Sequence, residues 1–185
     1  MDRCLSIFGE DCKQEILERV ERILNPEKRL KGQSVKINPQ VNKHLKEKHT
    51  QIVNLYFTVL EKVLEKEEKR GKTFQITDII KNDDFHRALI ACSIETVFFV
   101  NNFTDITFTE LLELCGVQAF EFWKIIASFV KFDAKLPQPL IRHFYSLEVK
   151  IIMNLAWKQG SVVQQIITQS YKQQNKVPNQ SKILI

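Results

Sequence analysis

The sequence has few residues that favour tight turns and no long apolar run. Only 5 glycines and 5 prolines occur in 185 residues, which argues against a sandwich or barrel with many turns and favours long helices. No run of 18 apolar residues is present and the N-terminus does not resemble a signal peptide, so we expect no membrane association. The 4 cysteines show no paired spacing, and we expect reduced thiols in an intracellular protein.

The excess of positive charge lies at the two ends of the chain. The formal net charge is +5, residues 1–50 carry 11 basic and 8 acidic side chains, and residues 158–185 carry four lysines and no acid. Residues 51–157 therefore carry a net charge of −2. This distribution does not indicate a basic folded face, so we expect no direct binding of nucleic acid.

Asp83 to Asn101 is the most apolar stretch and is apolar on nearly all sides if it is a helix. A helix of that kind lies in a core or spans a membrane. The run from Ala88 to Val100 is interrupted by Glu95 and is shorter than the roughly 20 residues that a membrane span needs. We therefore predict a central buried helix with other helices packed around it.

The other apolar residues recur with helical spacing. They predict helices over residues 11–24, 40–70, 77–81, 107–115, 117–132, 139–157 and 161–171. Asp11 with Gln14 and Thr107 with Glu110 form capping-box patterns that would begin two of these helices, and Gly116 is expected to end the second. Because no alternating strand pattern occurs, we predict an all-α fold.

Three parts are expected along the chain. Residues 1–39 form an N-terminal helix and a basic loop, residues 40–173 form the helical domain, and residues 174–185 form a polar tail that we expect to be disordered.

The residues that usually carry chemistry do not form a catalytic pattern. His44 and His49 are five residues apart and do not share a helix face as zinc ligands would. His86 and Cys92 fall on different faces, so buried structural roles are expected for both. Glu95 is either a catalytic acid or the partner of a Lys or Arg on a neighbouring helix, and the second interpretation is favoured. We predict no enzyme, no cofactor and no metal site.

Three segments carry a resemblance to a known family. Residues 85–95 (FHRALIACSIE) resemble the central helix of the A half of the pocket in retinoblastoma-family proteins, and most closely in its retinoblastoma-like members. Residues 119–126 (AFEFWKII) resemble that family's aromatic-rich helix, and residues 151–157 resemble its terminal leucine-alanine-tryptophan helix. The similarity covers residues 40–173 and extends more faintly back to Ile7.

The resemblance implies a cyclin fold, a helical bundle about one central helix. Such an A half pairs with a B half, and the groove between them holds the activation peptide of E-two-F transcription factors, which represses their targets in the nucleus during cell-cycle control. Cyclin-dependent kinase complexes are further implied partners. Carried over by position, the peptide-binding residues would be Arg70, Phe85, Lys124, Ile126, Val130, Lys131, Arg142 and Glu148.

Charge and spacing agree in part with that implied site. Lys124 and Lys131 are seven residues apart and project from one face of a helix, and Arg142 is expected to join them from the next helix. A cationic face with an apolar floor suits an acidic, hydrophobic peptide. Without the resemblance, the same pattern is also that of an ordinary solvated helix face.

The sequence also departs from the family pattern. Ala127 and Tyr145 stand where members usually carry acids, and Asp78 stands where a lysine is expected, which puts affinity and choice of partner in doubt. The B half and its cleft for Leu-x-Cys-x-Glu motifs are missing. We therefore expect a fragment, or a chain that works with a B half supplied elsewhere. The competing hypothesis is a cyclin-box protein that activates a kinase, or a factor IIB-like transcription factor.

Overall fold

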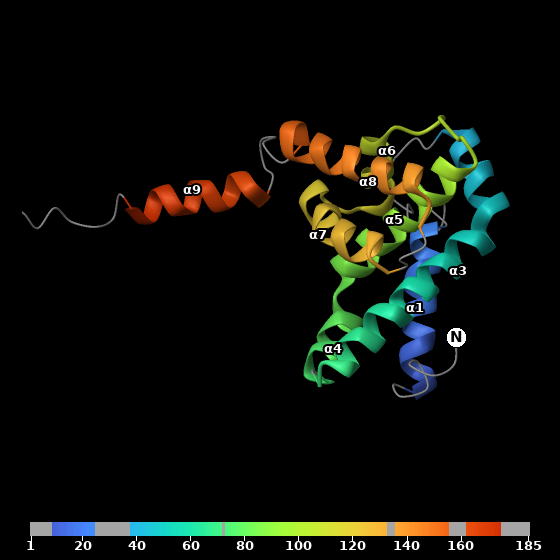
Figure 1. The fold of residues 1–185 in the computed structure, drawn as a ribbon, viewed down its shortest axis with the longest axis horizontal. Helices are drawn as coiled ribbons and strands as arrows, with labels where there is room; N and C mark the ends of the chain where they lie inside the picture. The colour runs from blue at the N-terminus through green and yellow to red at the C-terminus, as the bar shows by residue number, and fades with distance from the viewer. Residues whose placement is uncertain (1–8, 25–37, 72, 133–135, 156–161, 175–185) are drawn as a thin grey trace, which may run out of the picture.

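The computed structural model describes residues 9–24, 38–71, 73–132, 136–155 and 162–174 (Figure 1). Every element in these ranges is a helix, so the all-α prediction is confirmed. None of the described helices is long and apolar enough to cross a membrane. The elements are α1 (Gly9–Leu24), α3 (Pro39–Lys69), α4 (Thr73–Lys81), α5 (Asp83–Val100), α6 (Phe108–Cys115), α7 (Ala119–Val130), α8 (Gln138–Lys150), η2 (Ile151–Leu155) and α9 (Val162–Gln174).

Helix α5 is the central helix that the sequence predicts. It packs against α1, α3, α4, α6, α7 and α8, which surround it in Figure 1. Each residue from Ala88 to Ile94 is at most 1% exposed, so the helix has no solvent face over that length. It begins where the side chain of Asn82 accepts a hydrogen bond from the backbone N–H of Phe85 at 3.0 Å.

The long helix α3 crosses the bundle beside α5 (Figure 1). Asn38 caps its N-terminus and Pro39 occupies the first helical turn, where the missing N–H has no cost. Its apolar stripe, which includes Leu45, Ile52 and Tyr56, is buried against the core. At 31 residues the helix is about 46 Å long, so its last turns extend to the edge of the bundle.

The capping prediction for α6 is confirmed. Thr107 and Glu110 form a reciprocal capping box, and Gly116 ends the helix at φ +63°. The predicted cap at Asp11 is wrong, because α1 already includes Gly9 and Asp11 lies within the helix. The spacing of a capping box also occurs inside amphipathic helices, so the pattern alone does not locate a start.

Two further boundaries differ from the prediction. Helix α4 begins at Thr73 and not at Thr77, because Ile76 and Ile80, four residues apart, are both buried. The single helix predicted to reach Trp157 changes to the π-helical turn η2 at Ile151. An apolar spacing of three and four residues does not distinguish the two helix types. Trp157, the basic loop at 25–37 and the tail after Gln174 lie outside the described residues.

Helix α1 shares the core of the other helices. Its residues Ile16, Val20, Ile23 and Leu24 are buried in the same apolar cluster as α5. The side chain of Arg19 crosses to the other elements, donating to the carbonyl of Ile80 at 3.1 Å and pairing with Asp83 at 3.1 Å. The division of the chain at residue 39 stays a prediction.

Candidate functional site

A basic hollow lies between the C-terminal turns of α3 and the end of α7. Its volume is about 320 Å³. It is lined by Lys62, Val63, Lys66, Glu67, Arg70, Ser128, Lys131 and Phe132. Four cations and one carboxylate give this lining a formal net charge of +3. We call it the α3–α7 hollow.

Local helix geometry explains how the cations gather. Lys62, Lys66 and Arg70 are spaced four apart at the end of α3, so they project from one side of that helix. Lys131 is the C-cap of α7, and Phe132 follows it. Cations near helix C-termini also interact favourably with the helix dipole, which reduces the cost of crowding them.

The contacts inside the hollow leave much of its charge unpaired. Arg70 donates to Glu67 at 2.7 Å, which neutralises one cation. The Lys62 ammonium lies 5.1 Å from the ring centre of Phe132, a cation–π contact. Within the described part of the chain, Lys66 and Lys131 make no ion pair. The half-buried Val63 and Phe132 add apolar surface, so the hollow suits an anion that carries apolar groups.

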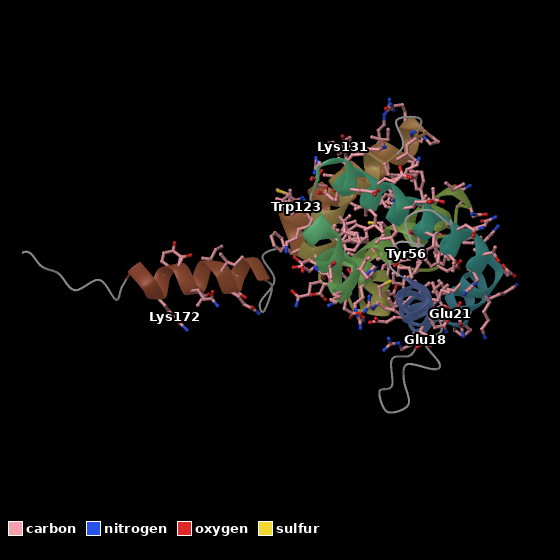
Figure 2. The ribbon with its side chains drawn as sticks, turned by 90° about the horizontal axis from the view of Figure 1, so that it is seen from below. Glu18, Glu21, Tyr56, Trp123, Lys131 and Lys172 are labelled. Carbon is pink, nitrogen blue, oxygen red and sulfur yellow. The ribbon has the colours of Figure 1, made fainter. Side chains whose placement is uncertain are left out.

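The structure brings together two of the residues that the resemblance assigns to peptide binding. Arg70 and Lys131 come from different helices and both line the α3–α7 hollow. Val130 is half-buried beside Lys131. Figure 2 shows Lys131 at the periphery of the molecule, where a ligand has access to it.

Lys124 and Ile126 on α7 are not part of the hollow. Lys124 is exposed and already engaged, with its ammonium 2.9 Å from Glu121 and 4.9 Å from the ring centre of Phe120. Ile126 is 1% exposed and packs in the core, so in this chain it supports the helix and offers no surface to a ligand.

The remaining predicted residues lie apart from the hollow. Glu148 on α8 accepts a hydrogen bond from the indole N–H of Trp123 at 2.9 Å, which ties α8 to α7. Arg142 is exposed on α8, six residues and therefore about 120° around the helix from Glu148. Phe85 is half-buried at the start of α5, with its ring against that of His86.

Sequence reasoning missed most of the residues that line the hollow, among them Lys62, Lys66 and Phe132. A signal was present, because the four-residue spacing of Lys62, Lys66 and Arg70 is legible in the sequence. The charged end of α3 has the pattern of an ordinary solvated helix segment, and nothing in the sequence indicates that the end of α7 lies beside it.

The positions that depart from the family pattern are all on the surface. Ala127 of α7, Tyr145 of α8 and Asp78 of α4 are exposed. None of them lines the hollow.

A buried polar cluster holds the start of α5. The Nε2 of His86 lies 2.7 Å from the carbonyl oxygen of Ile80, and its Nδ1 lies 2.6 Å from the hydroxyl of Tyr56. A carbonyl only accepts, so Nε2 carries the proton and Tyr56 donates to Nδ1. Burial, with a smaller contribution from Arg19, lowers the pKa of His86 to about 4 against the opposing effect of the Ile80 hydrogen bond. The imidazole is therefore neutral at pH 7. Its partner Tyr56, labelled in Figure 2, is fully buried.

The other candidates for chemistry have structural roles. Cys92 is fully buried, and burial raises the pKa of its thiol. Glu95 has a partner on a neighbouring helix as expected, but the partner is His143, with Nε2 2.7 Å from Oε1, and not a Lys or Arg. The flat imidazole fits because it also stacks on Phe99 at 4.1 Å. Among the described residues, no group of three or more His, Cys, Asp or Glu side chains is arranged to hold a metal ion.

Comparison with known proteins identifies the family. The model of the retinoblastoma-associated protein A domain matches residues 1–167. The chain belongs to the retinoblastoma-associated A-domain family. The pocket-protein family that the resemblance indicated is thereby confirmed.

Plant proteins are among the relatives of this A domain. It is 27% identical over 91% of its length to the retinoblastoma-related protein of Ricinus communis and 31% identical over 87% to retinoblastoma-related protein 2 of Oryza sativa subsp. japonica. It is 37% identical over 59% of its length to retinoblastoma-related protein 1 of Triticum aestivum. The matches cover 17%, 17% and 11% of those proteins, so the chain corresponds to a small part of each.

Proposed function

We propose that this A domain binds the acidic activation peptide of an E-two-F-type transcription factor together with a B half, and acts as a corepressor in the nucleus. The observation that carries the proposal is the α3–α7 hollow, in which Arg70 and Lys131 meet. Its net charge of +3 and its apolar lining complement a peptide that combines carboxylates with hydrophobic side chains.

Lys131 is the best-placed cation for the first contact with such a peptide. It is exposed and has no ion-pair partner within the described residues, so binding would not first break an existing pair. A hydrogen bond between an ammonium and a carboxylate contributes roughly 1.5–3 kcal/mol. Lys124 lies seven residues earlier on α7, about 10 Å along the helix axis, and extends the positive surface beyond the hollow.

The size of the hollow supports the need for a second half. About 320 Å³ is at the lower end of small-molecule sites and accommodates a few side chains of a peptide, while stable protein interfaces bury roughly 1,200–2,000 Å² in total. The remaining contact area must come from another surface, and a B half beside the hollow would supply it.

A binding role also fits the polar groups of the interior better than catalysis does. His86 is fixed between Tyr56 and Ile80, and Cys92 is sealed in the core. Neither is accessible to a substrate. We therefore propose no enzymatic activity. Binding to cyclin-dependent kinase complexes stays a prediction.

The proposal is tested by isothermal titration calorimetry of the 1–185 chain with an acidic E-two-F activation peptide, with and without added B half. We expect weak binding by the chain alone and tighter binding when the B half is present. Absence of binding in both titrations would rule out the proposed ligand, while equal binding in both would rule out the role of the B half.

A further inference from the structure

The outer side of α8 and η2 exposes a set of large apolar side chains. Tyr145 is 54% exposed, Val149 60%, Ile152 43% and Met153 70%. Tyr145, Val149 and Met153 are four residues apart and therefore follow one line along the helix, and Ile152 lies beside it. A contiguous exposed apolar surface of this kind usually marks a contact site. We call these four residues the α8 face.

Helix α9 has an apolar stripe that is also uncovered. Ile166 is 51% exposed and Tyr171 is 64% exposed, and Ile167 lies between them on the same side. Figure 1 shows α9 projecting away from the bundle. A helix of 13 residues is marginally stable by itself in water, and its β-branched and Ser/Thr residues are weak helix formers. Its stability therefore requires a surface on which to pack.

The α8 face is within reach of α9. Six residues, 156–161, connect the end of η2 to the start of α9, and connections of 2–8 residues are usual between antiparallel helices of a bundle. Distances along the two helix axes can be compared in such a hairpin. Ile166 and Ile167 lie about 6–8 Å along the axis from the start of α9. Ile152 and Val149 lie about 5–9 Å along the axis from the end of η2, and therefore at a similar height. Tyr171 would then lie opposite Tyr145, so the two apolar lines match in register.

The charges on α9 do not oppose this contact. Lys172 is the only charged residue of α9. At 100° per residue it lies on the side of the helix opposite to the apolar stripe, and Figure 2 shows it projecting from α9 into solvent. It would therefore point away from the exposed Arg142 of α8.

We propose that α9 packs antiparallel on the α8 face and covers it with Ile166, Ile167 and Tyr171. The contact removes both apolar surfaces from water and adds α9 to the bundle. This inference concerns a different surface from the α3–α7 hollow and does not rest on peptide binding.

Paired cysteines test the contact in the 1–185 chain. Cys4 and Cys12 are first replaced by serine, and the buried Cys92 and Cys115 are retained. Val149→Cys is combined with Ser170→Cys, which lies within the apolar stripe of α9, or with the matched control Lys172→Cys on its opposite side. A disulfide requires Cα atoms closer than about 7 Å.

We expect the Val149–Ser170 pair to form an intramolecular disulfide at least about 10-fold faster than the control pair, because packing raises the effective concentration of one thiol at the other. Equal rates for the two pairs would overturn the proposal. A disulfide that forms only between two molecules would also overturn it, and would show that a second copy occupies the α8 face.

Hydrogen exchange supplies a second measurement without new thiols. We expect the backbone amides of residues 166–172 to exchange slowly in the parent chain and at least about 10-fold faster in Val149→Asp, since a carboxylate on the α8 face weakens the packing of α9 and lowers the free energy of its local opening. Gln51→Asp, at an exposed position of α3, should leave this protection unchanged. Fast exchange of α9 in the parent chain would contradict the proposal, and because Val149 is exposed, unfolding of the variant is not expected to obscure the result.

Discussion

At the scale of single residues, the buried polar contacts around His86 have the clearest consequence for stability. Tyr56 and His86 are both almost fully buried and satisfy each other through one short hydrogen bond. Removing the hydroxyl in Tyr56→Phe leaves Nδ1 of His86 without a donor in a site that water does not reach. We expect a loss of about 1–3 kcal/mol in the free energy of unfolding, measured by chemical denaturation. A loss below about 0.5 kcal/mol would mean that the contact does not hold the start of α5.

His86 also predicts how stability depends on pH. The folded chain keeps the imidazole neutral down to its pKa of about 4, whereas in the unfolded chain it takes up a proton near pH 6.5. Between these values the unfolded state binds more protons, so the free energy of unfolding decreases as the pH falls from about 6.5 to about 4. The contribution of the neutral His86 imidazole to the free energy of unfolding is fully present above pH 6.5 and amounts to about 3 kcal/mol.

The measurement is a series of denaturation curves between pH 7.5 and about 4, the span over which the imidazole titrates. In His86→Gln this part of the pH dependence should be lost. His49→Gln is the matched control, because His49 is only partly buried, beside Glu21, and lies outside the His86 cluster, so this variant should keep the slope. A parent protein whose stability is flat over this range would contradict the assignment of a buried neutral imidazole.

The sequence predicts whether a residue on one helix is buried, but it does not predict which residue on another helix that side chain contacts. The buried role of Cys92 followed from its position in an apolar helix. Glu95 pairs with His143, 48 residues later in the sequence, and Arg19 pairs with Asp83, 64 residues later. Both pairs depend on how different helices pack against each other. Spacing along one helix carries no information about such contacts.

At the scale of elements, the sequence predicts the end of a helix well where capping residues determine it. The capping box of Thr107 and Glu110 was predictable because both partners lie within four residues. The Thr107 backbone N–H bond to Glu110 lowers the pKa of that carboxyl, with a further contribution from the Thr107 side chain. The start of α4 and the π-turn η2 were not predictable, because packing against other elements sets them.

The cap of α6 predicts a measurable cost. In Thr107→Ala the backbone N–H of Glu110 loses its side-chain acceptor, and we expect a loss of about 1 kcal/mol in stability. Thr107→Ser keeps the hydroxyl and should be close to the parent protein. Thermal or chemical unfolding measures both variants, and equal stability of the two would show that the cap does not contribute.

Helix α1 predicts the outcome of a truncation. Deleting residues 1–39 exposes the core surface that Ile16, Val20 and Leu24 cover and removes the Arg19 links to Ile80 and Asp83. Burial of each such side chain contributes roughly 1.5–3 kcal/mol, so we expect the 40–185 chain to be unfolded or strongly destabilised by circular dichroism. A cooperative transition at the parent midpoint would instead confirm the predicted division at residue 39.

At the scale of the whole molecule, the candidate site depends on the fold and not on a motif. Lys62 and Lys131 are 69 residues apart in sequence and line the same hollow because α3 and α7 both pack on α5, with the end of α7 beside the last turns of α3. The overall net charge of +5 does not indicate this, because its excess lies at the ends of the chain. The cyclin-type bundle thus creates a local positive field in a central segment that is negative overall.

The family resemblance predicted the fold and two residues of the hollow, Arg70 and Lys131. It also proposed Lys124, which the structure shows paired with Glu121 on the same helix. Since that pair must be given up before Lys124 binds a carboxylate, we expect Lys124→Glu to weaken peptide binding less than Lys131→Glu does. Calorimetry of the two variants side by side measures the difference, and an equal or larger effect at Lys124 would move the centre of the site along α7.

The most direct test of the α3–α7 hollow is the affinity of Lys131→Glu for the acidic activation peptide, measured by calorimetry in the presence of the B half. Lys43→Glu is the matched control, because Lys43 is an exposed lysine at the other end of α3. We predict that Lys131→Glu weakens binding by about 1.5–3 kcal/mol, roughly 10- to 150-fold in Kd, while Lys43→Glu leaves it unchanged. Equal affinity of the parent chain and Lys131→Glu would contradict the assignment of the hollow as the peptide site.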